Sequence, residues 1–162
     1  SVKKLTTLAL FSTIALTIFL LESLIPPLMP IPGIKLGLAN IVTLILLANA
    51  TWRDALIVLL VRIILGSIFA GQMMSFFYSL SGGLASLLVM AILHHFLGSR
   101  LLWFTSIMGA LAHNTGQIAV AAIVLGSGYV LFYYPYLIIS GIITGLFTGL
   151  AAWYVHPRLP KI

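Results

Sequence analysis

The sequence predicts an all-α membrane protein, a single domain of six transmembrane helices covering residues 1–162. Its residues are 62% hydrophobic and only 6% charged, whereas a soluble domain carries about 25% charged residues. The chain divides into six apolar runs, and a spanning helix needs about 20 mostly apolar residues. This composition excludes a soluble globular domain and a disordered chain. The net charge of +6 is dispersed between the runs, so we expect no nucleic-acid partner.

The first three runs differ in length. Residues 5–25 form the first span, which ends at Pro26 because consecutive prolines stop a helix. This run is too long for a signal-peptide core and lacks a cleavage site of small residues, so we expect a retained helix. Residues 36–50 form a short second span, which is tilted, partly re-entrant or shielded by other helices. Residues 54–70 form the third span, before Gly71.

The last three runs are longer and contain glycines. We place these spans at residues 73–97, 101–125 and 133–155. In the last span, glycine repeats every four positions, a spacing that lets another helix approach closely. This ridge consists of Gly141, Gly145 and Gly149.

The distribution of basic residues predicts the orientation. If the N-terminus is cytoplasmic, six basic residues lie inside, only Lys35 lies outside, and Arg62 falls within a span, which satisfies the positive-inside rule. We therefore expect both termini in the cytoplasm and the chain in the cell membrane. The six inner residues are Lys3, Lys4, Arg53, Arg100, Arg158 and Lys161.

A small set of polar residues within the apolar runs predicts a binding site. Polar groups at depth are costly and usually face the protein interior or a cavity. Glu22, Asn40, His113 and Gln117 come from three different runs, yet all fall in the predicted outer half, and Lys35 lies at the outer rim. We expect them to line a polar pocket that opens outward.

Other residues in the runs have two interpretations. Arg62 either contacts a ligand or holds Glu22 or backbone carbonyls. Asn114 lies beside His113 and extends the polar patch, although hydrogen bonding between helices explains such residues equally well. Ser81 and Gly82 suggest a local break in the fourth span, which is tolerated where protein or a cavity covers the backbone.

Several kinds of chemistry are excluded by absence. The chain has no cysteine and only two acidic residues, Glu22 and Asp54. It therefore lacks the carboxylate cluster of a hydrolytic metal centre and the aspartate-rich metal–diphosphate site used in prenyl transfer. No GxxxxGK[ST] motif is present, so the chain does not hydrolyse ATP itself. We expect a binding protein rather than an enzyme, with no metal and no cofactor.

Five segments resemble one family, the Gx transporter family, also labelled heptaprenyl diphosphate synthase component I. That family is similar to the substrate-binding S components of energy-coupling factor (ECF) transporters of prokaryotes, which are six-helix membrane proteins. The segments are KLGLANIVTL (35–44), WRDALIVLLVRIILGS (52–67), SLSGGLASLLVM (79–90), GALAHNTGQ (109–117) and LIISGIITGLFTG (137–149).

The resemblance implies a fold, a site and partners. An S component captures a micronutrient and docks on a coupling membrane subunit that carries two ATPase subunits. The substrate would bind in the outer half, under the loop PPLMPIPGIK (26–35) between the first two spans, which would act as a lid. Docking uses small residues on the first helix, which Ala9 and Thr13 match loosely.

Two alternatives stay open. The chain could be a non-catalytic membrane accessory subunit of a polyprenyl diphosphate synthase or a quinone pathway. It could also be a structural subunit of a larger complex, whose polar groups serve only helix packing. If it captures a substrate, apolar walls around Lys35, Arg62 and His113 suit an amphipathic molecule with an anionic group. An isoprenoid, a quinone precursor and a flavin-like vitamin all fit this description.

Overall fold

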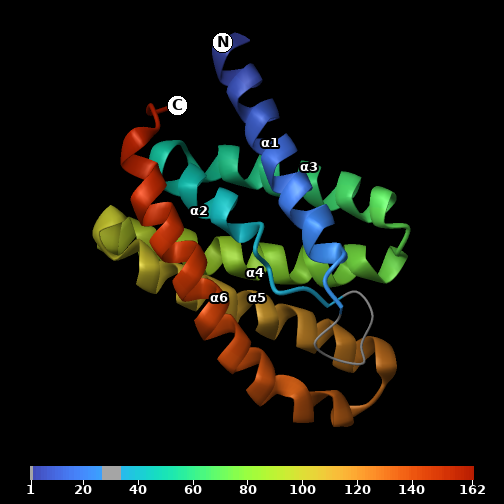
Figure 1. Cartoon of the computed structure of the whole chain (residues 1–162). Helices are drawn as coiled ribbons and strands as arrows, with labels where there is room; N and C mark the ends of the chain where they lie inside the picture. Colours follow the sequence, from blue (N-terminus) through green and yellow to red (C-terminus); the bar gives the residue numbers. More distant parts are fainter. Residues whose placement is uncertain (1, 27–33) are drawn as a thin grey trace.

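The structure is a computed structural model that describes residues 2–26 and 34–162, and these residues are mostly α-helical, with no β-strand among them (Figure 1). The prediction of an all-α protein is confirmed. Short 3₁₀ helices follow α4, precede α6 and end the helical chain, at Gly98–Leu101, Gly128–Tyr133 and His156–Arg158. The α-helices are α1 (Val2–Ser23), α2 (Asn40–Asn49), α3 (Trp52–Ala70), α4 (Met73–Leu97), α5 (Leu102–Leu125) and α6 (Tyr134–Val155).

The length and apolarity of the helices support a membrane protein. Among the described residues, three segments are long and apolar enough to cross a membrane: Val2–Ser23, Met73–Leu125 and Gly128–Arg158. The second segment holds both α4 and α5. The remaining two helices do not qualify, because α3 carries three charged residues and α2 has only 10 residues. Six spans and cytoplasmic termini therefore stay predictions.

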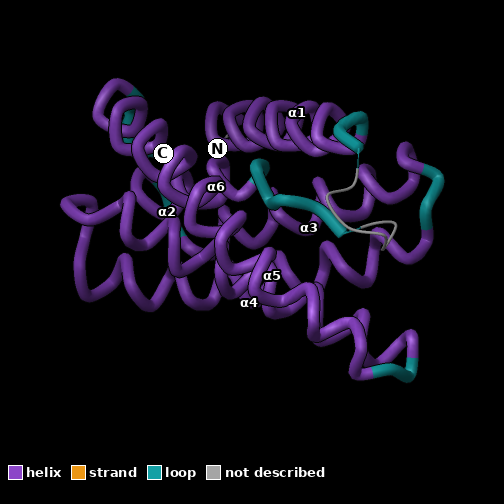
Figure 2. Tube along the Cα trace, turned by 60° about the horizontal axis from the view of Figure 1, so that its bottom comes forward, coloured by secondary structure: helices purple, strands orange, loops and turns teal. Residues whose placement is uncertain are grey.

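The short helix α2 lies in the middle of the bundle and contacts all five other α-helices (Figure 1). Eight of its 10 residues are buried, which agrees with shielding by other helices, one of the three explanations for its length. Helix α5 packs most extensively against α4 and α6, and α1 packs mainly on α3 at the edge of the bundle (Figure 2). Both ends of the chain lie at the same end of the bundle (Figure 1).

Helix α2 begins later than the apolar pattern predicts, at Asn40 instead of residue 36. Gly37 has a φ of +80°, a left-handed conformation that does not continue into a helix. Residues 34–39, directly before α2, therefore enter the bundle as a non-helical segment. Most of the loop expected to act as a lid, residues 27–33, lies outside the described residues.

The glycine ridge of α6 packs as predicted. A Cβ atom on Gly145 would lie 2.7 Å from the Cα atom of Ile107, and one on Gly149 would lie 2.6 Å from the Cα atom of Trp103. Both distances are shorter than van der Waals contact, so only glycine allows this approach. The ridge brings α6 against the backbone of α5.

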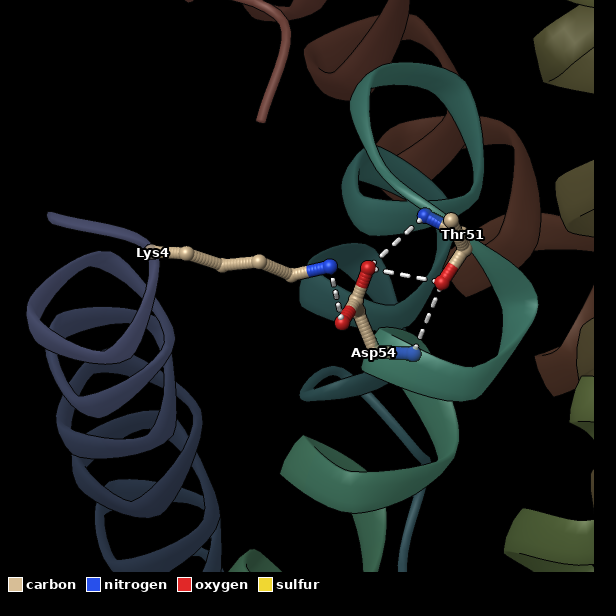
Figure 3. Close-up of polar contacts among 3 residues, drawn as sticks. All are labelled: Lys4, Thr51 and Asp54. Carbon is tan, nitrogen blue, oxygen red and sulfur yellow. Dashed lines mark hydrogen bonds and ion pairs between the residues drawn. The ribbon is translucent and has the colours of Figure 1, made fainter. Parts of the chain in front are cut away.

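At the end of the bundle that holds both termini, α1 is tied to the start of α3 (Figure 3). Thr51 and Asp54 form a capping box: the Thr51 hydroxyl accepts from the Asp54 N–H at 3.3 Å, and the Asp54 carboxylate accepts from the Thr51 N–H at 3.1 Å. The other carboxylate oxygen of Asp54 pairs with the ammonium of Lys4, 2.9 Å away. This ion pair holds the first turn of α1 against the turn between α2 and α3.

Candidate functional site

The non-helical residues 34–39 are surrounded by polar side chains from α1, α2 and α5, the three runs from which the sequence predicted the site. Glu22, Asn40, His113 and Gln117 all contact this segment, through hydrogen bonds or through Gly37. All four are buried. The structure therefore brings the predicted residues together; whether they bind a ligand stays a prediction.

Glu22 holds the segment by its backbone. The buried face of α1 consists of Phe11, Ala15, Phe19 and Glu22, a helical spacing that points the carboxylate into the bundle. Its two oxygens accept from the N–H groups of Gly37 at 2.7 Å and Leu38 at 3.1 Å. These N–H groups precede α2 and would otherwise lack partners in an apolar interior. Glu22 thus acts first as an acceptor for the backbone.

Gln117 holds the same segment from the opposite side. Its Oε1 atom accepts from the N–H of Lys35 at 2.9 Å, and its Nε2 atom donates to the carbonyl oxygen of Lys35 at 2.7 Å. The side chain is fully buried on α5. This paired amide contact resembles one rung of a β-ladder and fixes where Lys35 lies.

Lys35 and Arg62 both lie over the aromatic ring of Phe19. The ammonium of Lys35 lies 3.2 Å from the centre of the Phe19 ring and donates to the Ser23 hydroxyl. The guanidinium carbon of Arg62 lies 5.7 Å from the same ring centre, within the range of a cation–π contact. Burial lowers the pKa of the Lys35 ammonium to about 8; Glu22 opposes this shift and Arg62 adds to it.

Several buried polar atoms near this segment have no hydrogen-bond partner among the described residues. They include Nη2 of Arg62 and both amide atoms of Asn40. The ring nitrogens of His113 also lack a partner in good hydrogen-bond geometry, although the ring lies near the backbone of Gly82. Arg62 and Glu22 form no ion pair within 4 Å, so the pairing considered from sequence is not a direct one. Buried polar groups in proteins are normally satisfied by protein or water. Unsatisfied groups of this kind are candidates for ligand contact.

These unpaired groups lie against three glycines, which have no side chain to keep them apart. A Cβ atom on Gly37 would lie 3.0 Å from Nδ2 of Asn40 and 2.8 Å from Cδ2 of His113. A Cβ atom on Gly82 would lie 2.8 Å from Nδ1 of His113. On the adjacent Gly83, it would lie 3.5 Å from Nη2 of Arg62. The three side chains therefore border one small region next to α4.

The other predicted site residues take part in helix packing. The Ser81 hydroxyl donates to the carbonyl oxygen of Gly116 at 2.9 Å, and Gly82 is continuous with α4 rather than a break in it. Nδ2 of Asn114 donates to the carbonyl oxygen of Leu137 at 2.7 Å, which joins α5 to α6, while its Oδ1 atom is unpaired. The local break expected at Ser81 and Gly82 is wrong, because α4 runs through both residues. The contact of Asn114 matches the interpretation of hydrogen bonding between helices.

A cavity of about 550 Å³ opens beside the cluster, within the size range of small-molecule sites. Its polar lining includes Glu22, Ser23, Lys35 and Gln72, and most of its wall is apolar, from the end of α1 and from Phe69 of α3. Arg62, Asn40 and His113 lie outside this lining. Glu22 and Lys35 are therefore the residues through which the cavity meets the buried cluster.

The proposed docking residues lie on the outer surface of α1. Ala9 and Thr13 are both exposed, and the Thr13 hydroxyl donates to the carbonyl oxygen of Ala9 at 3.0 Å. They lie away from the face of α1 that packs on α3. The surface is available to another protein or to lipid.

Sequence analysis missed three participants: Phe19, Ser23 and Gly37. Phe19 falls three residues before Glu22 on the same helix face, so the helical period could have placed it beside the cluster. A Cβ atom on Gly66 would lie 2.5 Å from the Phe19 ring, so glycine makes room for the ring against α3. Gly37 offered no signal, because a positive φ is not visible in one sequence.

Comparison with known proteins gives one match. No curated protein and no solved structure matches the chain. The described residues contain no group of three or more His, Cys, Asp or Glu side chains able to hold a metal ion. The model of one protein family, described as heptaprenyl diphosphate synthase component I, matches residues 11–155. This match includes every candidate site residue, and the chain therefore belongs to the heptaprenyl diphosphate synthase component I family.

Proposed function

We propose that this protein is a substrate-binding membrane subunit, the S component of an ECF-type importer in a prokaryotic cell membrane. It would capture a small micronutrient or amphipathic metabolite. The observation that carries this proposal is the cluster of buried, unpaired polar atoms beside a cavity of about 550 Å³ in a largely apolar bundle. Such a cluster suits recognition of a polar group, and the apolar wall suits the rest of a small molecule.

The same residues argue against catalysis. The whole chain has two acidic residues, and the Asp54 carboxylate is bound to Thr51 and Lys4. Both oxygens of Glu22 are bound to backbone N–H groups. No pair of carboxylates is therefore left to hold a metal–diphosphate group. We propose a non-catalytic protein that takes its energy from a coupling membrane subunit and two ATPase subunits.

The description of the family favours a second candidate. A membrane accessory subunit of a polyprenyl diphosphate synthase would need no catalytic carboxylates of its own, and its cavity would receive a lipid-like chain. The two candidates differ in their partners. The importer subunit binds a membrane protein with ATPases, whereas the accessory subunit binds a soluble synthase.

The test is purification of the tagged protein from its native membrane in mild detergent, followed by mass spectrometry of co-purifying proteins and small molecules. The expected result is a coupling membrane subunit with two ATPases and a retained metabolite. A prenyl synthase without ATPases would overturn the importer in favour of the accessory subunit.

A surface variant sharpens this test. Ala9→Trp places a large side chain on the exposed face of α1, and we expect it to remove the coupling subunit from the purified complex. The matched control is Leu146→Trp, at an exposed position of α6. Equal loss with both variants, or loss with neither, would contradict docking through α1.

A further inference from the structure

The charges around residues 34–39 do not balance, and this imbalance points to the kind of ligand. Lys35 and Arg62 carry one positive charge each, and both contact the Phe19 ring. Glu22 is the single acidic residue that contacts this segment. Asp54 is engaged elsewhere, with Thr51 and Lys4. With His113 neutral, the cluster has one positive charge in excess.

The excess charge is poorly compensated by the protein. Arg62 is 3% exposed, and its Nη2 atom has no hydrogen-bond partner among the described residues. A buried cation without a paired anion is strongly unfavourable, whereas a paired one is tolerated. Glu22 attracts Arg62 electrostatically but forms no ion pair with it within 4 Å. Two neutral side chains of the same region, the Asn40 amide and the His113 ring, are 7% and 2% exposed and also have unpaired atoms. A single added negative charge would neutralise the cluster, and the Lys35 ammonium, which lines the cavity, could bind it.

We propose that the cavity takes a monoanionic amphiphile, with a carboxylate or phosphodiester head directed toward the Lys35–Arg62 cluster and an apolar body along the wall of α1 and α3. This inference rests on the proposed function, because it names the substrate class of the same site. The head enters where the cavity meets Glu22 and Lys35. The apolar lining beyond them fits an uncharged chain or ring.

The charge count also separates ligand classes. A dianion or a diphosphate would leave the cluster with excess negative charge beside the Glu22 carboxylate, and a neutral molecule would leave the cation uncompensated. A monoanion is therefore preferred over both. A ligand with a diphosphate head is disfavoured, although the description of the family mentions a diphosphate-forming enzyme.

The test uses four probes with a similar apolar body and different heads: 4-phenylbutyrate, a monoanion; 4-phenylbutanol, which is neutral; (3-phenylpropyl)malonate, a dianion at pH 7; and 4-phenylbutylammonium, a cation. Binding is measured by calorimetry at pH 7 on the full chain in nanodiscs of phosphatidylcholine. We expect phenylbutyrate to bind about tenfold or more tightly than the neutral alcohol, a difference of about 1.4 kcal/mol. We expect the ammonium probe to bind weakest. Equal affinity for all four probes, or no binding of any, would overturn the proposal.

Two substitutions shift the charge in opposite directions. Arg62→Gln neutralises the cluster, so the preference for the carboxylate over the alcohol should disappear; Lys35→Gln makes the same change at a half-buried site and serves if Arg62→Gln fails to fold. Glu22→Gln raises the excess to two positive charges, so the dianionic malonate should gain affinity relative to the monoanionic phenylbutyrate. The control is Asp54→Asn, which removes the other acidic residue and should leave the order of the probes unchanged. If Glu22→Gln and Asp54→Asn behave alike, the cluster does not set the preference.

The source of the anion is tested by the lipid. In nanodiscs that contain phosphatidylglycerol, a phosphodiester monoanion, phenylbutyrate should bind more weakly if a lipid head occupies the site, and equally well if a free metabolite does. The outcomes also separate this inference from the proposed function. Co-purification of ATPases without discrimination between probes would refute only the ligand class. Discrimination between probes without ATPases would refute only the importer.

Discussion

Gln117→Met tests whether one side chain positions Lys35. Methionine has a similar length and no branching, so it fills the site on α5 but removes both hydrogen bonds to the Lys35 backbone, which measure 2.9 and 2.7 Å. Each such bond contributes about 0.5–1.5 kcal/mol net, so the pair contributes about 1–3 kcal/mol. Because 1.4 kcal/mol is a factor of ten, opening of this contact should become about 5- to 150-fold more frequent.

The assay is amide hydrogen exchange of the purified protein, read at single residues by fragmentation mass spectrometry. The Lys35 N–H should exchange faster by that factor. The N–H groups of Gly37 and Leu38 are bound to Glu22 instead, so they should change much less. Glu22→Gln should give the reverse pattern. The reasoning is refuted if the Lys35 amide exchanges within about twofold of the wild-type rate, or if all three amides accelerate together.

Three further predictions concern stability and pH. Thr51→Ala removes the capping box and should lower the unfolding free energy in micelles by about 1 kcal/mol, whereas Lys4→Met should lower it by less, since Lys4 is partly exposed; a larger loss for Lys4→Met would contradict this ranking. Gly37→Ala forces an L-residue into φ +80° and should lower thermal stability by about 2 kcal/mol; an unchanged melting temperature would show that this turn tolerates a Cβ atom. Binding of a monoanion should weaken by about tenfold in total as the pH rises from 7 to 10, because Lys35 loses its charge around its lowered pKa of about 8. Lys35→Gln should make the binding curve flat over this range, and a wild-type curve that is already flat would remove Lys35 from the site.

The helices were predictable because long apolar runs leave few alternatives. Proline and glycine ended them near the expected residues, as at Gly71 and Gly126, which have left-handed conformations. The start of α2 was not predictable. The residues after Lys35 are as apolar as a helix, and the chain departs from a helix there because Glu22 and Gln117, distant in sequence, satisfy its backbone.

The candidate site was predictable in its members more than in its contacts. Depth along each run correctly brought Glu22, Asn40, His113 and Gln117 to one region. Their hydrogen-bond partners could not be predicted from the spacing. The Glu22 carboxylate and the Gln117 amide both bind backbone groups, and nearly every residue of a chain carries such groups. The sequence suggested Arg62 as a partner of Glu22, but the two form no ion pair within 4 Å. Both cations contact the Phe19 ring instead.

The buried polar residues around the non-helical segment before α2 fall into two groups. One group binds the backbone of the segment, and the other does not. A 10-residue helix is about 15 Å long, roughly half of a bilayer's hydrocarbon thickness. The non-helical residues that precede it depend on Glu22 and Gln117 for hydrogen bonds to Lys35, Gly37 and Leu38, so the loss of either side chain should destabilise this segment. The side chains of Asn40 and His113 form no hydrogen bond with the backbone of this segment among the described residues. We therefore expect related chains to vary more at Asn40 and His113 than at Glu22 and Gln117, which bind the backbone.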